Sequence, residues 1–277
     1  MLRKFFSNGR QPSSTSELDS LSPTTSLSET VPLKEFENAL DIAVNKIQTC
    51  LSTDTKSNVK ASFASALANM LIEDEALELV VAFCGIPTYS RICAKSSLGM
   101  LLCKSLCILM DCVSMETVQT CTKLASRVLS GLIQTEEGQE NIVQYVDILI
   151  SLAVDDRAMV NDRNVCTCIS NVARELFSDL AKFGFKSQPL HEDIGDKRFL
   201  PMLLHKAQAA MDVKSISHSA SLAALALRLL RAQTIVFSGS EALLHFSHDG
   251  TYNIISRLLH ALPNHETSQE FENAFLA

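Results

Sequence analysis

The sequence predicts an all-α protein, and three observations support this prediction. Apolar residues beyond residue 32 recur every three or four positions, which is the spacing of one helix face rather than of a strand. Nine glycines and seven prolines among 277 residues fall well below the usual ~12% share, which disfavours turn-rich sandwiches and barrels. Residues 88–188 and 202–262 contain no proline at all. We therefore expect about ten helices.

The apolar spacing places these helices in chain order. The first should begin near Pro32, because the missing N–H of a proline would be unpaired in the first turn of a helix anyway. The positions that define the pattern are Leu33, Phe36, Leu40, Val44, Ile47 and Leu51; Phe63, Leu67, Met70 and Leu71; Leu124, Val128, Leu129 and Leu132; Val143, Val146, Ile150 and Ala153; and Leu222, Leu225, Leu229 and Leu230.

Helix ends are expected at glycines, and one helix start at a pair of acids. The glycines are Gly85, Gly138, Gly184, Gly239 and Gly250. Glu136-Glu137 should begin a helix, because carboxylates favour the positive end of the helix dipole.

Residues 1–31 are expected to form a disordered, Ser/Thr-rich tail. Twelve of these positions are Ser or Thr, and such a segment buries too little apolar surface to offset the entropy of ordering it. Ser22-Pro23 could accept a phosphate. A mitochondrial presequence is the alternative, because residues 1–16 are basic and free of acids. Residues 32–277 should form the folded helical domain.

Composition also excludes several classes of partner and site. The tail is charge-balanced, so the formal charge of −7 lies on the body, which makes nucleic acid an improbable partner. The longest apolar stretch, Ser97–Val113, contains Lys104 and Asp111, so we expect a buried helix and not a membrane span. Nine cysteines, an odd number scattered among apolar residues, favour a reducing compartment, either cytoplasm or nucleus.

Three segments share the order of a long Ala/Leu-rich helix, a polar break, a short helix and a third apolar stretch. They are Val59–Cys93, Cys121–Ala153 and, less regularly, Ala220–Leu259. One such unit alone would leave an apolar face in water, so neighbouring units are expected to stack.

The residues Ala66-Leu67-Ala68-Asn69-Met70-Leu71 and Gly85-Ile86-Pro87 carry a resemblance to the armadillo-type helical repeat. Ile169-Ser170-Asn171-Val172-Ala173 and Gly131-Leu132-Ile133 with Asn141-Ile142-Val143 match it in part. The resemblance covers about residues 56–260 and implies an irregular α-solenoid, with HEAT-like repeats as the alternative. Its unit spacing is wider than the ~42 residues of the family. The chain ends in the helix-like Glu270–Ala277, and two interpretations of this end are open: a fragment of a longer solenoid, or an end that docks on another subunit.

The same resemblance implies a non-enzymatic scaffold that binds protein partners, including extended peptide segments, in a concave groove. Asparagines in the positions of Asn69 and Asn171 face that groove in armadillo repeats and pair with a peptide backbone. The alternative role for these asparagines is a helix cap or an inter-helix hydrogen bond. The groove tryptophans of nuclear-localisation-signal receptors are absent, so that particular function is not implied.

No motif predicts a catalytic site, a metal or a cofactor. The sequence lacks phosphate-loop, dinucleotide-binding, nucleophile-elbow and zinc-protease signatures. Three polar groups are expected to be ordinary surface features: His245, His248 and Asp249; Asp155-Asp156-Arg157 with Asn161, Asp162 and Asn164; and Lys197-Arg198. The competing hypothesis is an enzyme or small-molecule binder with a pocket in the helical core that encloses several of His205, His218, His245 and Cys168.

Overall fold

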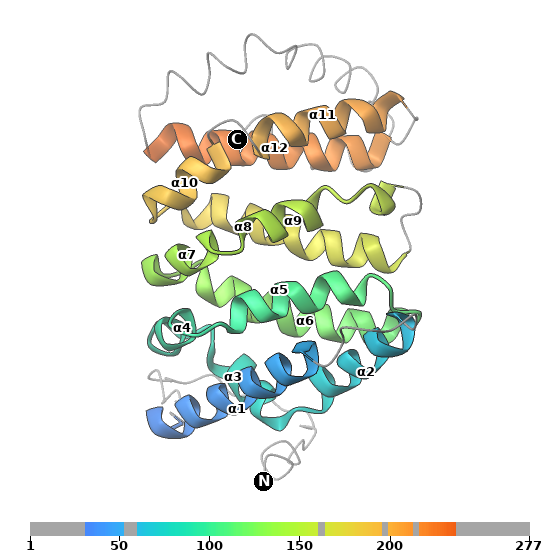
Figure 1. The fold of residues 1–277 in the computed structure, drawn as a ribbon. Coiled ribbons are helices and arrows are strands. Elements are labelled where there is room, and N and C mark those ends of the chain that lie inside the picture. Colours follow the sequence, from blue (N-terminus) through green and yellow to red (C-terminus); the bar gives the residue numbers. More distant parts are fainter. Residues whose placement is uncertain (1–30, 53–59, 160–163, 196–198, 213–215, 237–277) are drawn as a thin grey trace, which may run out of the picture. The chain divides into compact units, whose positions relative to one another are not determined.

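A computed structural model describes residues 31–52, 60–159, 164–195, 199–212 and 216–236, and every regular element in these ranges is a helix (Figure 1). The all-α prediction is thereby confirmed. The chain divides into residues 1–31 and residues 32–277, and all the described elements belong to the second unit. The predicted disordered tail lies outside the described residues, apart from Val31.

The described ranges hold twelve α-helices and one 3-10 helix. They are α1 (Leu33–Ser52), α2 (Lys60–Glu73), α3 (Glu75–Phe83), α4 (Pro87–Ala94), α5 (Leu98–Leu109), α6 (Met115–Leu132), α7 (Glu136–Val143), α8 (Val146–Ala153), η2 (Asp156–Met159), α9 (Val165–Phe183), α10 (Gln188–Gly195), α11 (Phe199–Asp212) and α12 (Ile216–Val236). The count exceeds the expected ten because helices of eight residues, such as α7 and α10, are too short to show a clear apolar period.

Polar side chains cap several helix starts. Asp74, Ser114, Thr135 and Asn164 each accept a hydrogen bond from a backbone N–H in the first turn of α3, α6, α7 and α9, respectively. Such caps satisfy N–H groups that have no partner within the helix.

Some of the predicted helix boundaries agree with the structure and others do not. Glu136 and Glu137 do lie in the first turn of α7. Gly184 ends α9 with a φ of 79°, a conformation that favours glycine. Gly138 does not end a helix, since it lies inside α7, where its N–H donates a hydrogen bond to the Thr135 hydroxyl. Gly239 and Gly250 lie outside the described residues.

The helices follow a recurring order: a long helix, a short one, then one or two that complete the set. We call each set a tier: the first is α2–α5, the second α6–α8 and the third α9–α11, after which α12 supplies another long helix. The long helices α2, α6, α9 and α12 pack side by side in that order (Figure 1). The helices α1, α5 and α8 form a second row, and α4, α7 and α10 a third. The sequence segments had anticipated the first two tiers but not the third as a unit, because only Ile169–Ala173 carried its pattern.

Apolar side chains from every tier fill the space between the rows. Phe36 of α1 stacks against Tyr89 of α4 with ring centroids 4.7 Å apart, and Phe177 of α9 lies 4.4 Å from Phe199 of α11. Each of these rings is 5% exposed or less, so its burial stabilises the fold by about 1.5–3 kcal/mol.

The cysteines belong to this core. None of the nine is in a disulfide, and six are buried. Burial raises the pKa of Cys84 to about 11 and the pKa of Cys93 and Cys121 to about 12. A buried thiol with a raised pKa is a weak nucleophile and packs as a small apolar group.

Among the described helices, no single one has both the length and the apolar composition to cross a membrane. The pair α4 and α5 meets those two criteria together, but a bend of 75° separates them. Eight of the twelve residues of α5 are buried, as predicted for the apolar stretch around Lys104, while Lys104 itself is exposed.

Close packing between the first two tiers generates a prediction at Gly131. A Cβ atom on Gly131 of α6 would lie 2.3 Å from the backbone carbonyl oxygen of Cys84, which has no flexible end to move aside. We expect Gly131→Ala to destabilise the protein by about 1–3 kcal/mol in urea unfolding. Gly85→Ala is the matched control, because a Cβ there meets nothing within 4 Å. Equal stability of the two variants would contradict this packing.

Candidate functional site

Asn69 and Asn171, the two residues that the sequence nominates for binding, lie on α2 and α9, two long helices of the same row. Both side chains are exposed, and neither forms a hydrogen bond with another described residue. The alternative role, in which each amide is buried and hydrogen-bonded to another helix, is therefore not what the structure shows. Their role in binding a partner stays a prediction.

The apolar spacing of the two helices accounts for this exposure. In α2, Leu67, Ala68 and Leu71 are buried, and Asn69 projects from the opposite side. In α9, the buried side is formed by Ile169, Val172 and Ala173, and Asn171 projects away from it. A period of 3.6 residues separates the two faces of a helix in this way.

Helix α6 lies between the two asparagines, and two contacts set its register. The Cys121 thiol donates to the carbonyl oxygen of Ala68 on α2 at 3.5 Å, and the Thr122 hydroxyl lies 3.6 Å from the Cys168 thiol on α9. The middle of α6 therefore lies beside the stretch of α2 that holds Asn69 and the stretch of α9 that holds Asn171.

Each of these three helices is covered on one side by the row of α5 and α8, so its exposed side chains point away from that row. We call the exposed surface so formed the long-helix face. It includes Asn69 and Glu73 of α2, Glu116, Thr120, Lys123 and Arg127 of α6, and Asn171 and Glu175 of α9.

The two basic residues of the long-helix face stand one helical turn apart, and neither forms an ion pair with another described residue. Elsewhere several basic side chains are paired: Lys46 with Asp74 at 2.9 Å, Arg91 with Glu137 at 3.3 Å and Lys182 with Asp179 at 2.9 Å. Lys123 and Arg127 were not among the partner-binding residues predicted from the sequence. Their signal was available, because the apolar period of Leu124, Val128, Leu129 and Leu132 places them on the opposite side of the helix.

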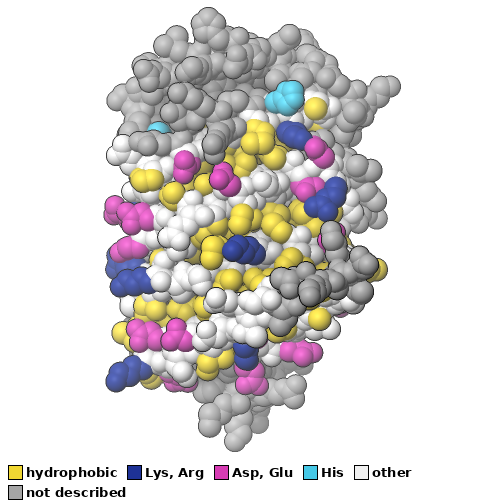
Figure 2. All heavy atoms as spheres, viewed as in Figure 1, with side chains coloured by type: hydrophobic (Ala, Val, Ile, Leu, Met, Phe, Trp, Pro, Cys, Tyr) yellow, Lys and Arg dark blue, Asp and Glu magenta, His cyan; other side chains and the backbone are white. Residues whose placement is uncertain are grey.

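The side of the molecule that carries α5 shows apolar bands. Figure 2 has the view of Figure 1, with α5 in front of α6, and shows hydrophobic side chains in bands along the helices. Charged side chains gather mainly at the margins of this surface.

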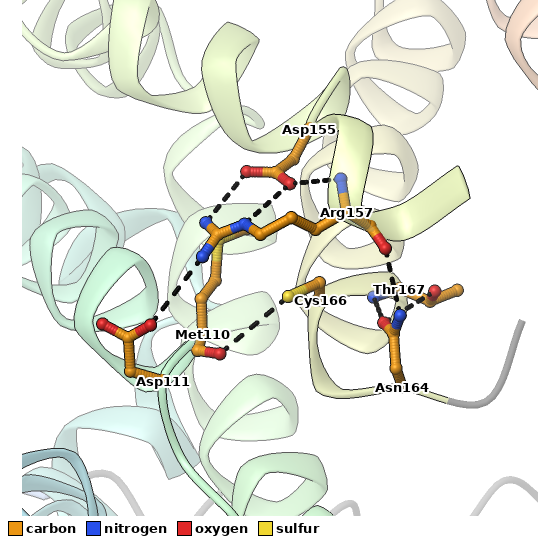
Figure 3. A network of polar contacts seen from close by, with 7 residues as sticks. All are labelled: Met110, Asp111, Asp155, Arg157, Asn164, Cys166 and Thr167. Carbon is orange, nitrogen blue, oxygen red and sulfur yellow. Dashed lines mark hydrogen bonds and ion pairs between the residues drawn. The ribbon is translucent and has the colours of Figure 1, made fainter. Parts of the chain in front are cut away.

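A polar network at the margin joins three elements, and Arg157 of η2 is its centre (Figure 3). The guanidinium binds both carboxylate oxygens of Asp155, at 3.1 Å from Nε and 3.0 Å from Nη2. It also approaches Asp111 at 3.8 Å and the Met110 sulfur at 2.8 Å. These contacts tie η2 to the end of α5.

The same network reaches the start of α9. The Asn164 side-chain NH₂ donates to the carbonyl oxygen of Arg157 at 3.0 Å, and its oxygen accepts from the backbone N–H of Thr167 at 2.7 Å. The Cys166 thiol donates weakly to the Met110 carbonyl at 3.9 Å. The network therefore links successive tiers.

The sequence predicts a solvated turn between Asp155 and Asn164, and the structure corrects this in part. Arg157 engages both oxygens of Asp155, whose side chain is only 19% exposed, because the turn must hold α5 and α9 together. Asn161 and Asp162 lie outside the described residues. In the part described, no group of three or more His, Cys, Asp or Glu side chains could hold a metal ion.

Arg157 also governs the protonation of its partner. Partial burial of Asp155 raises its pKa, but the hydrogen bonds and positive charge of Arg157 outweigh this, and the pKa of Asp155 lies below its usual value. Its carboxylate form is thereby favoured in the folded protein.

Two buried polar side chains hold the tiers in register, and sequence alone gave no sign of either. Gln139 of α7 is fully buried: its NH₂ donates to the carbonyls of Ile133 and Gly184, both at 2.9 Å, and its oxygen accepts from two backbone N–H groups after Gly184. Arg174 of α9 donates from Nε to the Ala153 carbonyl at 2.7 Å, at the end of α8, and burial lowers its pKa to about 10. Both act as structural ties.

The structure describes the side chains of two of the four residues that the competing hypothesis of a core pocket names. Cys168 is half-buried and contacts Thr122, and His205 is exposed on α11. The side chains of His218 and His245 are outside the described part of the chain. So are His248, Asp249 and the pair Lys197-Arg198.

Comparisons of the chain with protein-family models, with curated proteins and with solved structures found no match.

The Arg157–Asp155 pair generates a pH-dependent prediction. A carboxyl group with a lowered folded pKa contributes stability above its unfolded pKa of ~4, and this contribution is lost as the pH falls through the folded value. We expect Arg157→Ala to cost about 0.2–1 kcal/mol at pH 7, since the guanidinium is largely exposed. The deficit relative to the wild type should shrink near pH 3, measured by urea unfolding at both pH values.

Lys104→Ala serves as the control, because Lys104 is exposed and forms no ion pair with a described residue. Its effect should be small at both pH values. A deficit of Arg157→Ala that stays constant from pH 7 to pH 3 would show that Arg157 acts through packing on Met110 instead.

Proposed function

We propose that this chain is a non-enzymatic, armadillo- or HEAT-like scaffold that binds an extended segment of a partner protein across the long-helix face. The observation that carries the proposal is the placement of Asn69 and Asn171. Two exposed amides without a described partner stand on either side of α6, in one row of helices. Polar groups held outward at such positions are suited to pair with another chain.

The order of the helices supports the armadillo-like part of the proposal. A long helix, a short one and a completing set follow one another three times, and like helices pack on like. Two placements support the resemblance: Asn69 lies on the long helix α2, and Gly85-Ile86 separates α3 from α4, which begins at Pro87. The bend between α4 and α5 makes the first tier irregular.

The chemistry of an amide explains why these residues suit a peptide backbone. An asparagine side chain carries both a donor and an acceptor, so one residue can pair with an N–H and a C=O of the same peptide. Since neighbouring packed helices lie about 8–10 Å apart, α2 and α9 are separated by about 16–20 Å. An extended chain covers this distance in about five or six residues.

The remaining aspects of the proposal rest on the sequence. The acidic body disfavours nucleic acid, and the unpaired cysteines favour the cytoplasm or nucleus. A small-molecule site in the core is the alternative. It would enclose several of His205, His218, His245 and Cys168, of which Cys168 contacts Thr122.

Removing the amides tests the proposal. Peptides of twelve random residues, displayed on phage, are selected on the immobilised full chain, and the affinity of the best is measured by fluorescence polarisation. We expect Asn69→Ala and Asn171→Ala each to weaken binding about 2- to 13-fold, the effect of one hydrogen bond of ~0.5–1.5 kcal/mol. The free energy of unfolding should change by less than ~0.5 kcal/mol, because both side chains are exposed.

Asn38→Ala provides the matched control, since Asn38 is exposed on α1, outside the row of long helices. It should leave both affinity and stability unchanged. The long-helix face would be rejected as the binding surface if no peptide is selected. It would also be rejected if neither Asn69→Ala nor Asn171→Ala changes the affinity of the selected peptides.

A further inference from the structure

We infer that the partner segment carries an acidic side chain, Asp or Glu, at the position that crosses α6, where Lys123 and Arg127 bind its carboxylate. This inference rests on the proposed function and names the chemistry of the partner. It follows from the position of the two cations between the asparagines and from their lack of an ion pair with any described residue.

Lys123 and Arg127 lie on the path between the two asparagines. The contacts of Cys121 with Ala68 and of Thr122 with Cys168 place the middle of α6 beside α2 on one flank and beside α9 on the other. A peptide that reaches from Asn69 to Asn171 must therefore pass over the exposed side of α6 at this level.

The two cations have no counter-ion in the described structure. Neither forms an ion pair or a side-chain hydrogen bond with a described residue, and both are exposed. Gln119, Thr120 and Ser130 lie one turn away along α6, and none is acidic. The nearest exposed acids on these stripes are Glu116, two turns from Lys123, and Glu73 on the neighbouring helix α2. Two like charges four residues apart on a helix repel one another, and an anion bound between them relieves that repulsion.

Other exposed cations, such as Lys34 and Lys104, also lack an ion pair with a described residue, but no second basic residue lies within one turn of either. The chain has 31 acidic and 24 basic residues, so counter-ions are in excess. Some acids pair with cations at other surfaces, as Asp74 does with Lys46 and Glu137 with Arg91. Lys123 and Arg127 instead stand one turn apart without a described counter-ion, so one anion can contact both.

The geometry of the pair suits a carboxylate. The guanidinium of Arg127 can bind both oxygens of a carboxylate at once, and the ammonium of Lys123 adds a charge one turn away. Glu175, the acid of this face on α9, lies beyond the central helix and would repel an acidic residue placed there. The site for the acidic residue is therefore confined to the central helix.

A charge-reversal experiment tests the inference. Twelve-residue random peptides are selected on the wild type and on the double variant Lys123→Glu/Arg127→Glu. Wild-type peptides should be enriched in Asp or Glu at one position, and the best of them should bind the double variant at least ~10-fold more weakly. The same peptide with that acid changed to Lys should regain affinity for the double variant and lose it for the wild type.

The control variant Lys34→Glu/Lys104→Glu changes the net charge by the same amount at exposed residues of α1 and α5. It should bind the wild-type peptide unchanged. Raising the salt concentration from 50 to 500 mM should weaken the wild-type complex and leave Lys123→Gln/Arg127→Gln nearly unaffected, because salt screens exposed charges.

Three outcomes would overturn the inference. Selected peptides without an acidic preference, but sensitive to Asn69→Ala, would retain the proposed function and remove the carboxylate site. An equal loss in the control variant would assign the effect to net charge. Selection of no peptide, or of peptides indifferent to both asparagines and both cations, would reject the binding surface together with the inference.

Discussion

The whole arrangement depends on one constraint: a tier of amphipathic helices cannot bury its own apolar surface. The central long helices α6 and α9 each have a long helix on both flanks, and α2, α6 and α9 are covered from behind by the row of α5 and α8. Only one stripe of each long helix then remains in solvent. Because that stripe faces the same way in α2, α6 and α9, the packing that stabilises the core also assembles the surface that we propose for binding.

Polar ties fix how one tier sits on the next, which apolar contacts alone would leave loosely specified. Gln139 joins the second tier to the residues after α9 through bonds to backbone groups that would otherwise be buried without partners. Ser90 of α4 does the same between the first two tiers, donating to the Gly131 carbonyl at 2.7 Å. A buried group that loses such a partner costs ~1–3 kcal/mol, so a shifted register would be penalised at each tie. These hydrogen bonds therefore also fix the relative positions of the helices that form the proposed binding surface.

Local periodicity predicted the helical class, and the missing N–H of Pro32 predicted the start of the folded part. The exposure of Asn69 was one of two alternatives, implied by the armadillo resemblance and opposed by a buried amide with a helix-cap or inter-helix hydrogen bond. The sequence did not predict α10, which is too short to display a period, or the Arg157 network, whose members lie on α5, η2 and α9. Lys123 and Arg127 could have been assigned to an exposed stripe from periodicity. Their place between Asn69 and Asn171 could not, because it follows from the contacts of Cys121 and Thr122 with two other helices.

The hydrogen bonds between adjacent tiers carry a consequence for how the molecule opens. They join residues about one tier apart along the chain: 41 positions separate Ser90 from Gly131, for example, and 53 separate Ala68 from Cys121. Each tier is thus held chiefly by its immediate neighbours, and separating an outer helix breaks one set of contacts while a central one breaks two. Backbone amides of α6 and α9 should therefore exchange with solvent deuterium more slowly than those of α1, and the protein should fray from an end before it melts in the middle.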